Sequence, residues 1–294
     1  MKAFKFLSNT AIVVSLALLA SCSSDDDVQT SGKKLVFRAN LESSEVTRAA
    51  LVSNNVHWDN NDQIAVFSDN YEYPSLFTVT PSSIDGTTAT FANYEEASET
   101  LPEPKMCYYA CYPLVSATFR TSSSMITSAL SANQKVSSGR AYDKSSLIMV
   151  ACADKNEKIF NFKNVPALIK VNISGNGDGK VKYVEVVAKN SANRLSGSFE
   201  ATVNYKSKNL KVNVNSDADI KNMVRLEIPA SDESKDFYLA VLPCYVNNGL
   251  TLKFESDVKG TVVYELSSDK DVTFKSSKIY PFGNFNVATF PTKE

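Results

Sequence analysis

From residue 34 onward, hydrophobic and polar residues alternate in short runs that are separated by turn residues. Apolar residues take every second position in 168–174, and the same pattern recurs in 210–215 and 250–255. A repeat of two predicts β-strands that bury one face and expose the other. Asp-Gly, Asn-Gly and Lys-Gly pairs lie between the runs and are typical of tight turns. The pattern therefore predicts an all-β chain of many short strands, as in β-sandwiches.

Some segments depart from this simple alternation. The runs 108–112 and 237–242 are apolar on both faces and end in Pro113 and Pro243, which predicts a central strand in each half of the chain. The segment 122–134 is weakly patterned, and it is the place where a short helix could form.

A domain boundary is expected near 164–166, where Asn-Val-Pro separates two β-rich series of similar length. A chain of 294 residues is long enough for two packed cores. We therefore predict an N-terminal β-sandwich over 34–163 and a C-terminal β-sandwich with a terminal strand over 164–294.

Residues 1–21 have the features of a bacterial lipoprotein signal peptide. Lys2 and Lys5 precede an apolar run at 11–19, which is too short to span a bilayer because a helix needs about 20 apolar residues. The run ends in Leu-Ala-Ser-Cys, which predicts cleavage between Ser21 and Cys22 and lipidation of Cys22. The acyl chains, such as palmitate, would tether the chain, each buried CH₂ contributing about 0.8 kcal/mol.

The stretch 22–33 that follows is polar and acidic and has no periodicity, which predicts a flexible tether after the lipidated cysteine. The three aspartates at 25–27 allow two interpretations. They are either a solvated part of the tether or an acidic signal that sends lipoproteins to the outer surface in one group of Gram-negative bacteria.

The charge of the chain bears on its partners, and its cysteine content bears on whether disulfides form. The formal net charge is −1, and Lys and Arg are scattered without a basic stripe, so nucleic acid is not an expected partner. Export permits disulfides between the cysteines that follow Cys22. Cys107 and Cys111 lie about 13 Å apart in one expected strand, too far to bridge. Either Cys107, Cys111, Cys152 and Cys244 are buried thiols, or one bridge joins neighbouring strands.

Candidate catalytic and metal-binding residues are few. His57 is the sole histidine, and no nucleophile motif such as G-x-S-x-G accompanies it. Asp59, Asn61, Asp62 and Asp69 offer oxygen ligands for calcium, but the glycine and glutamate of an EF-hand loop are missing. Turn and capping roles fit these residues better.

A carboxylate pair of the glycosidase kind is a further possibility to weigh. Glu95, Glu96 and Glu99 lie close in sequence, but Pro102 and Pro104 follow them in an expected surface loop. We therefore expect no catalytic residue, no metal site and no cofactor, and we predict that the chain is not an enzyme.

Several short elements follow the leader in a definite order. They are LVFRA at 35–39, TRAA at 47–50, the run WDNNDQIAVF at 58–67, the two strands that end in proline, and SKIYP at 277–281. This order resembles that of the fimbrillin-like lipoproteins, which comprise the major and minor subunits of type V pili and related surface adhesins.

The resemblance implies two tandem transthyretin-like β-sandwich domains in a lipoprotein of the outer membrane or of a fimbrium, with a role in cell adhesion. In stalk subunits of this family an arginine-specific protease cuts after the first strand, which here is the bond between Arg48 and Ala49. Removal of the first strand, 34–41, would open a groove that a strand of a homologous subunit fills by β-addition.

The C-terminus departs from the stalk pattern. Only 288–294 follows the expected last strand at 279–287, and seven residues span at most about 25 Å. The segment 282–290 could instead detach as the donor strand. Stalk, tip, anchor and non-pilus roles therefore stay open, since anchor and accessory members keep the first strand.

A second function from a different class is a monomeric surface lipoprotein that binds glycans. Such binding needs a cluster of exposed aromatic side chains, for which Tyr71, Tyr73 and Tyr94 are candidates. Most tyrosines in strands are instead core or interface residues, so this alternative depends on exposure.

Overall fold

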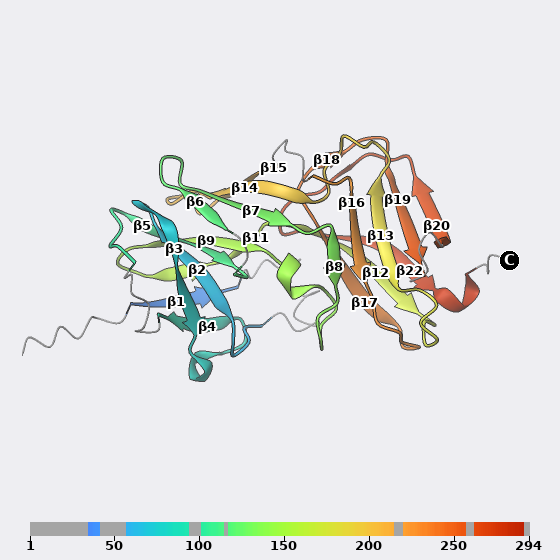
Figure 1. The fold of residues 1–294 in the computed structure, drawn as a ribbon, viewed down its shortest axis with the longest axis horizontal. Coiled ribbons are helices and arrows are strands. Elements are labelled where there is room, and N and C mark those ends of the chain that lie inside the picture. The colour runs from blue at the N-terminus through green and yellow to red at the C-terminus, as the bar shows by residue number, and fades with distance from the viewer. Residues whose placement is uncertain are drawn as a thin grey trace, which may run out of the picture. The chain divides into compact units, whose positions relative to one another are not determined.

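The computed structural model describes residues 35–41, 57–93, 101–114, 117–214, 220–256 and 262–290. These ranges form β-strands, turns and short 3-10 helices, and they contain no α-helix (Figure 1), so the all-β prediction is confirmed. No helix within them is long and apolar enough to cross a membrane. The 3-10 helices are η1 (Pro81–Ser83), η2 (Lys144–Ser146) and η3 (Val287–Thr289).

The largest sheet has eight strands, all from the first part of the chain. They are β1 (Val36–Asn40), β2 (Gln63–Ser68), β3 (Tyr71–Val79), β4 (Thr88–Ala92), β5 (Cys107–Tyr112), β9 (Met149–Asp154), β10 (Ile159–Asn161) and β11 (Lys163–Asn164). Their order is β10-β1-β4-β3-β2-β5-β9-β11. One face of this sheet lines a core in which Trp58 meets the rings of Phe91, Tyr112 and Phe162 at 5.0, 5.1 and 5.7 Å. Burial of such large apolar groups is the main term that stabilises the sheet.

A second sheet joins strands from both sides of residue 164. It contains β6 (Thr118–Arg120), β7 (Met125–Leu130), β14 (Gly197–Val203) and β15 (Leu210–Val214), in the order β15-β14-β7-β6. The short helix expected within 122–134 is wrong, because this segment supplies β7. Ile126 of β7 pairs with Ala201 of β14 and is buried in a core that includes Cys111 and Cys152. Cross-strand packing thus overrides a weak local pattern.

The rest of the chain forms two further sheets around another core, together with a small two-stranded sheet. The three-stranded sheet contains β12 (Ala167–Ser174), β17 (Lys235–Val241) and β22 (Ile279–Asn286), in the order β17-β12-β22. The five-stranded sheet contains β8 (Asn133–Lys135), β13 (Tyr183–Ala188), β16 (Met223–Glu227), β19 (Leu250–Glu255) and β20 (Val262–Ser268), in the order β20-β19-β13-β16-β8. The small sheet pairs β18 (Tyr245–Val246) with β21 (Val272–Thr273).

The predicted alternation is clearest in β12. Ile169, Val171 and Ile173 are at most 2% exposed, whereas Lys170 and Asn172 are half-buried. The buried set packs into the core between the three-stranded and five-stranded sheets. The pattern of hydrophobic residues therefore sets which face of the strand points inward.

The turn before β19 shows why one of the predicted turn glycines is needed. Gly249 has a φ of +82°, and a Cβ there would lie 1.8 Å from the carbonyl oxygen of Ser268. Only glycine combines this conformation with such a close approach of two backbone segments.

The two strands that are apolar on both faces have different places. β5 lies between β2 and β9 with every residue buried, which confirms its central position. β17 ends its sheet, so its predicted central position is wrong. Its free edge is covered instead: Gln134 donates to Ala240 O at 2.8 Å and accepts from Ala240 N at 2.9 Å, and Tyr238 N donates to Ala141 O at 2.9 Å. Covering an edge in this way prevents pairing with other chains.

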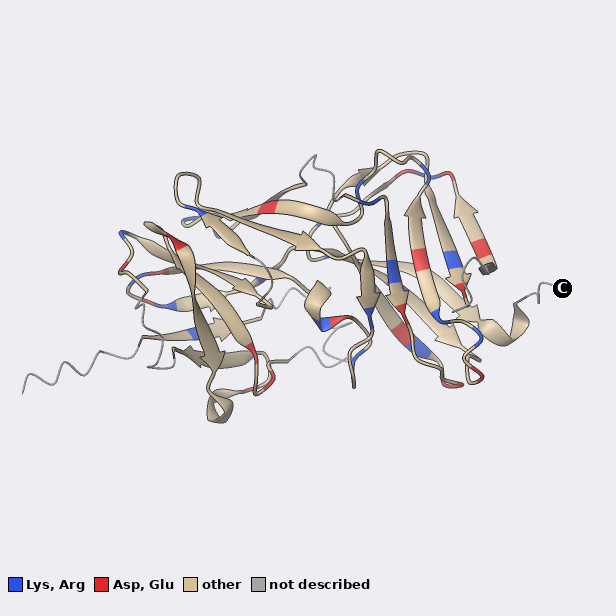
Figure 2. Ribbon diagram, viewed as in Figure 1, with Lys and Arg blue, Asp and Glu red and all other residues tan. Residues whose placement is uncertain are grey.

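Pairing across residue 164 is extensive. β7 pairs antiparallel with β14, and β8 pairs parallel with β16. Acidic and basic side chains are interspersed over the strands and turns (Figure 2). Arg225, for example, lies between Glu185 and Glu255 at 2.7 and 2.6 Å. The division into an N-terminal β-sandwich over 34–163 and a C-terminal β-sandwich over 164–294 stays a prediction.

Candidate functional site: the groove filled by the first strand

The first strand, β1, lies inside the eight-stranded sheet. It pairs antiparallel with β4 and parallel with the three-residue strand β10. Phe37 and Ala39 are fully buried and Leu41 is 7% exposed, whereas Val36 and Arg38 point outward. The sheet without β1 would have a groove with unpaired backbone groups along both sides and an apolar floor. We call this position the β1 groove.

Phe37 occupies the most aromatic part of the β1 groove. Its ring lies 5.0 Å from Phe77 and 4.9 Å from Tyr108, both edge to face, and it stacks on Phe160 at 4.8 Å. Aromatic pairs in these geometries stabilise a core beyond the area that they bury. The side chain of Phe37 therefore adds aromatic packing to the backbone pairing that holds β1 in place.

The other two inward side chains meet different surroundings. Ala39 faces Ala89 of β4 and Phe160 of β10, which are both buried. Leu41 follows the end of β1 beside a small cavity. The cavity is lined by Leu41, His57, Trp58, Tyr112, Arg140, Tyr142, Lys144, Leu147 and Met149.

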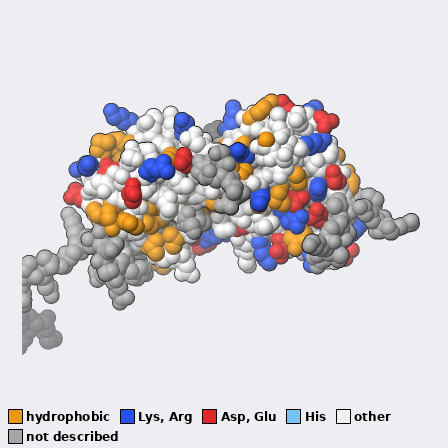
Figure 3. All heavy atoms as spheres, turned by 45° about the horizontal axis from the view of Figure 1, so that its top comes forward, with side chains coloured by type: hydrophobic (Ala, Val, Ile, Leu, Met, Phe, Trp, Pro, Cys, Tyr) orange, Lys and Arg blue, Asp and Glu red, His pale blue; other side chains and the backbone are white. Residues whose placement is uncertain are grey.

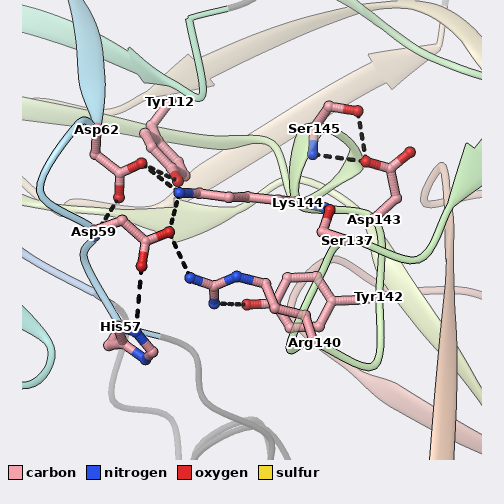
Figure 4. A network of polar contacts seen from close by, with 10 residues as sticks. All are labelled: His57, Asp59, Asp62, Tyr112, Ser137, Arg140, Tyr142, Asp143, Lys144 and Ser145. Carbon is pink, nitrogen blue, oxygen red and sulfur yellow. Dashed lines mark hydrogen bonds and ion pairs between the residues drawn. The ribbon is translucent and has the colours of Figure 1, made fainter.

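Charged side chains meet at this Leu41 end of the groove (Figure 4). Asp59 and Asp62, in the turn before β2, both bind the ammonium group of Lys144, and the distance from Asp62 is 2.6 Å. Arg140 donates to Asp59 at 2.6 Å, and His57 Nε2 lies 3.2 Å from the other oxygen of Asp59. We call this group the Asp59 network. It joins the turn before β2 to the segment that carries η2.

Two buried tyrosines extend the Asp59 network. The hydroxyl of Tyr112 donates to Asp62 at 3.0 Å, and Arg140 donates to the hydroxyl of Tyr142 at 2.8 Å. Burial raises the pKa of both tyrosines above the usual value, and the negative charge of Asp62 raises that of Tyr112 further. Both hydroxyls therefore keep their protons at neutral pH.

The ionisation of Asp59 shows what this network can do. Burial alone would raise its pKa, but hydrogen bonds and charges from Lys144 and Arg140 outweigh burial and hold the pKa below the usual 3.8. A carboxylate with a lowered pKa is a weak base that favours ion pairs over proton transfer. The network therefore fixes the position of two chain segments and has the character of a structural anchor.

His57 meets the Asp59 network at the protein surface. It lies ahead of β2 in irregular chain. Its side chain is 45% exposed and contacts the ionised Asp59. The contact that the described residues give its ring is with a carboxylate and not with a serine or cysteine nucleophile.

The acidic residues considered for calcium have turn and capping roles. Asp62 accepts the backbone N–H of Asp59 at 2.8 Å. Asp69 accepts the backbone N–H groups of Lys105, Met106 and Cys107 at 2.7, 2.7 and 3.2 Å. Across the described part of the chain, no three His, Cys, Asp or Glu side chains are grouped so that they could hold a metal ion.

Several predicted residues lie outside the described ranges. These are the signal cleavage residues Ser21 and Cys22, the processing residues Arg48 and Ala49, and the loop residues Tyr94, Glu95, Glu96 and Glu99. Lipidation and processing therefore stay predictions.

The remaining tyrosine candidates lie side by side on β3, where Tyr73 is exposed and Tyr71 is half-buried. Tyr73 is 68% exposed, and its ring centroid lies 5.5 Å from that of Tyr71 with an interplanar angle of 57°. On the face drawn in Figure 3, hydrophobic side chains form small groups with charged side chains of both signs between them. The pair is thus a limited aromatic surface.

The four cysteines described by the structure are free thiols. Cys107, Cys111 and Cys152 are buried and Cys244 is half-buried, as expected for small core residues. Burial raises the pKa of Cys107 to about 11 and that of Cys111 to about 12. Thiols with such pKa values stay protonated and are poor nucleophiles.

Sequence reasoning did not identify Arg140, Lys144 or Gln134 as important residues. Arg140 and Lys144 lie 81 and 85 residues from Asp59, and Gln134 lies 106 residues from Ala240. Their neighbours in sequence are mostly serine, alanine and glycine, so no local pattern marks them. The only feature that could have marked these three residues is that each is a polar residue in a short β-rich segment.

Neither a scan of protein-family models nor a search of curated proteins finds a match to this chain. Solved structures do match. A candidate cell adhesion protein from Bacteroides ovatus is 14% identical, with a TM-score of 0.52 over 88% of this chain and 94% of that chain. A candidate cell adhesion protein from Bacteroides uniformis is 16% identical, with a TM-score of 0.50 over 88% of this chain and 96% of that chain.

A tip fimbrial protein from Porphyromonas gingivalis, solved with a C-terminal truncation, is more distant. It is 12% identical, with a TM-score of 0.38 over 85% of this chain and 93% of that chain. At sequence identities this low, structural similarity is evidence for a shared fold only. The chain thus shares its all-β fold with the two Bacteroides proteins described as candidates for cell adhesion.

Proposed function

We propose that this chain is a non-catalytic cell-surface subunit of the fimbrillin-like type, which associates with other subunits by strand addition and serves in cell adhesion. The observation that carries the proposal is the place of β1, a short strand whose removal would open an apolar groove between β4 and β10. The adhesion role described for the two similar Bacteroides structures supports it. Lipidation at Cys22 would hold the unassembled chain at the outer membrane.

Strand addition has a clear physical basis at this site. A sheet that loses β1 exposes unpaired N–H and C=O groups on β4 and β10 together with the aromatic surface that Phe37 covered. An incoming extended segment would satisfy both needs, and main-chain hydrogen bonds would supply much of its affinity. The exchange therefore replaces one strand by another in an otherwise unchanged sheet.

The Asp59 network supports the same function. The chain leaves β1 at Leu41 and returns at His57, and both residues line the cavity next to this network. The ion pairs of Asp59 with Arg140 and Lys144 do not involve β1. They would keep the turn before β2 in place while β1 leaves and a donor strand enters.

The proposal is tested by processing of the native protein. We expect surface-purified wild type to show a free Ala49 N-terminus and a ladder of polymers. An Arg48→Ala variant should keep a blocked, lipidated Cys22 and lose the ladder. The control is Arg120→Ala, which changes an exposed arginine on β6. A polymer ladder that is the same in wild type and Arg48→Ala would contradict assembly by removal of β1.

The exposed ring of Tyr73, next to the half-buried ring of Tyr71, favours glycan binding by a monomer as a second candidate function. Exposed aromatic rings can stack on the apolar faces of sugars while their hydroxyl groups stay hydrated. A glycan array probed with wild type and Tyr73→Ala discriminates the two functions. Loss of a wild-type signal in the variant would support glycan binding, and the absence of any signal from the wild type would exclude this function.

A further inference from the structure

The side chains of β1 show what the β1 groove accepts. Three inward positions follow one another, and we name them the Phe37, Ala39 and Leu41 sites. Phe37 is surrounded by three aromatic rings, and Ala39 lies beside Ala89 and Phe160. Leu41 lines a cavity whose walls carry apolar side chains together with charged side chains of the Asp59 network. The groove therefore presents an aromatic, a small and an aliphatic site in turn.

The Ala39 site is the most selective of the three. Ala39 is fully buried and lies opposite Phe160, whose ring stacks on Phe37 at 4.8 Å. A larger side chain at this site would push Phe160 away and disturb the neighbouring Phe37 site. Cores packed at crystal density tolerate added methyl groups poorly.

The C-terminal segment 282–290 is held in its own core. Val287 is fully buried and Phe290 is 8% exposed, and the Phe290 ring stacks on Tyr264 at 4.6 Å. Phe285 lies 4.8 Å from Phe254 in the same core. Withdrawal of this segment as a donor would uncover these apolar contacts.

The segment 282–290 also fits the three sites poorly in either direction. The register Phe285, Val287, Thr289 puts valine in the Ala39 site. The reverse register Phe290, Ala288, Asn286 puts an asparagine in the Leu41 site, where it would lack the aliphatic side chain that Leu41 places near Leu147 and Met149. The reverse register Phe285, Gly283 does put a small residue after an aromatic one, but it leaves the Leu41 site empty, because the next alternate position is Pro281, outside the segment. No further register puts an aromatic residue in the Phe37 site followed by a small one.

We infer that the β1 groove selects a donor with aromatic, small and aliphatic side chains at alternate positions, and that this donor is not the C-terminal segment 282–290 of a second copy of this chain. The inference rests on the proposed strand exchange and adds the chemistry of the partner. The partner carries an extended segment with the pattern Phe-x-Ala-x-Leu or a close equivalent.

The test uses the full chain from Cys22, with a site-specific protease sequence inserted in the link 42–48 and cut once. Labelled peptides in excess then compete with the cut strand, and fluorescence anisotropy reports binding. The peptides are 35–41, the same peptide with Ala39→Val, the same peptide with Val36→Ala, and 282–290. Val36 points outward, so Val36→Ala is the matched control.

We expect peptide 35–41 to bind and the Val36→Ala peptide to bind within about twofold of it. The Ala39→Val peptide and peptide 282–290 should each bind about tenfold more weakly or worse. Equal binding of 282–290 and 35–41, or of the Ala39→Val peptide and 35–41, would overturn the selectivity and leave strand exchange intact. Failure of peptide 35–41 itself to bind would overturn the proposed function, and the selectivity with it.

Discussion

Asp59 shows how a single side chain joins segments that are far apart in the sequence. It binds Arg140 and Lys144, and it is 37% exposed, so water and salt screen part of the attraction. Removing one member of such a cluster leaves its partners without their counter-charge. Loss of Asp59 is therefore expected to lower the stability of the fold in part because Arg140 and Lys144 would be poorly paired next to the β1 groove.

We predict that Asp59→Asn lowers the free energy of unfolding by about 1 kcal/mol at pH 7, after allowing for solvent screening. The folded-state pKa of Asp59 lies below 3.8, so its contribution is present above that value and is lost as the pH falls through the folded pKa. Urea unfolding of wild type and variant at pH 7 and near pH 2 measures this. The difference between them should shrink at the lower pH.

Asp85→Asn is the matched control for this experiment, because Asp85 is exposed in a turn. It should change the free energy of unfolding by less than about 0.5 kcal/mol. A loss in Asp59→Asn that stays the same at both pH values would contradict the ionic role of Asp59.

At the scale of elements, β17 illustrates how an end strand is hidden from other molecules. All residues from Phe237 to Val241 are buried although the strand ends its sheet. The side chain of Gln134 supplies both hydrogen bonds that a neighbouring strand would make to Ala240. A side-chain amide thus replaces a strand at one position of the edge.

We predict that Gln134→Ala lowers the free energy of unfolding by about 1–3 kcal/mol, since it leaves a buried N–H and a buried C=O without partners. The amide hydrogen of Ala240 should exchange faster with solvent in the variant. Asn133→Ala, in an exposed position of the same strand, is the control. Equal protection of the Ala240 amide in wild type and Gln134→Ala would contradict this account of the edge.

The elements differ in how well the sequence predicts them. β12 and β5 were predicted because alternation and a continuous apolar run are local signals of a half-buried and a central strand. β7 was not, because its weak pattern becomes a strand only when it pairs between β6 and β14. Likewise, β17 can lie at the edge of its sheet because Gln134 covers it, and no pattern in the local sequence of β17 indicates this contact.

At the scale of the whole molecule, pairing across residue 164 bears on how the chain folds. β14 and β15 complete the sheet that contains β6 and β7, and the shared core includes Phe119, Ile126 and Phe199. A chain that ends before β14 would leave β7 without the strand that pairs with it, and the apolar face of β7 would be less well covered. Such a face favours association with other molecules.

We therefore predict that a fragment of residues 22–163 is aggregated or partly unfolded, while the chain from Cys22 to its end is monomeric in the absence of processing. Size-exclusion chromatography and amide NMR spectra of the two proteins measure this. A matched fragment that extends to residue 214 restores β14 and β15 and should be better folded. A monodisperse 22–163 fragment with dispersed amide signals would contradict the prediction.

By itself, the sequence determined the all-β class, the central strand β5 and the inward face of β12. These follow from local patterns, because a strand with one wet face must alternate and a buried strand must be apolar. Only the tertiary structure decided that β7 joins β14, that Gln134 covers β17, and that Arg140 and Lys144 converge on Asp59. Those contacts link residues about 70 to 106 positions apart, and no local periodicity encodes which distant partners meet.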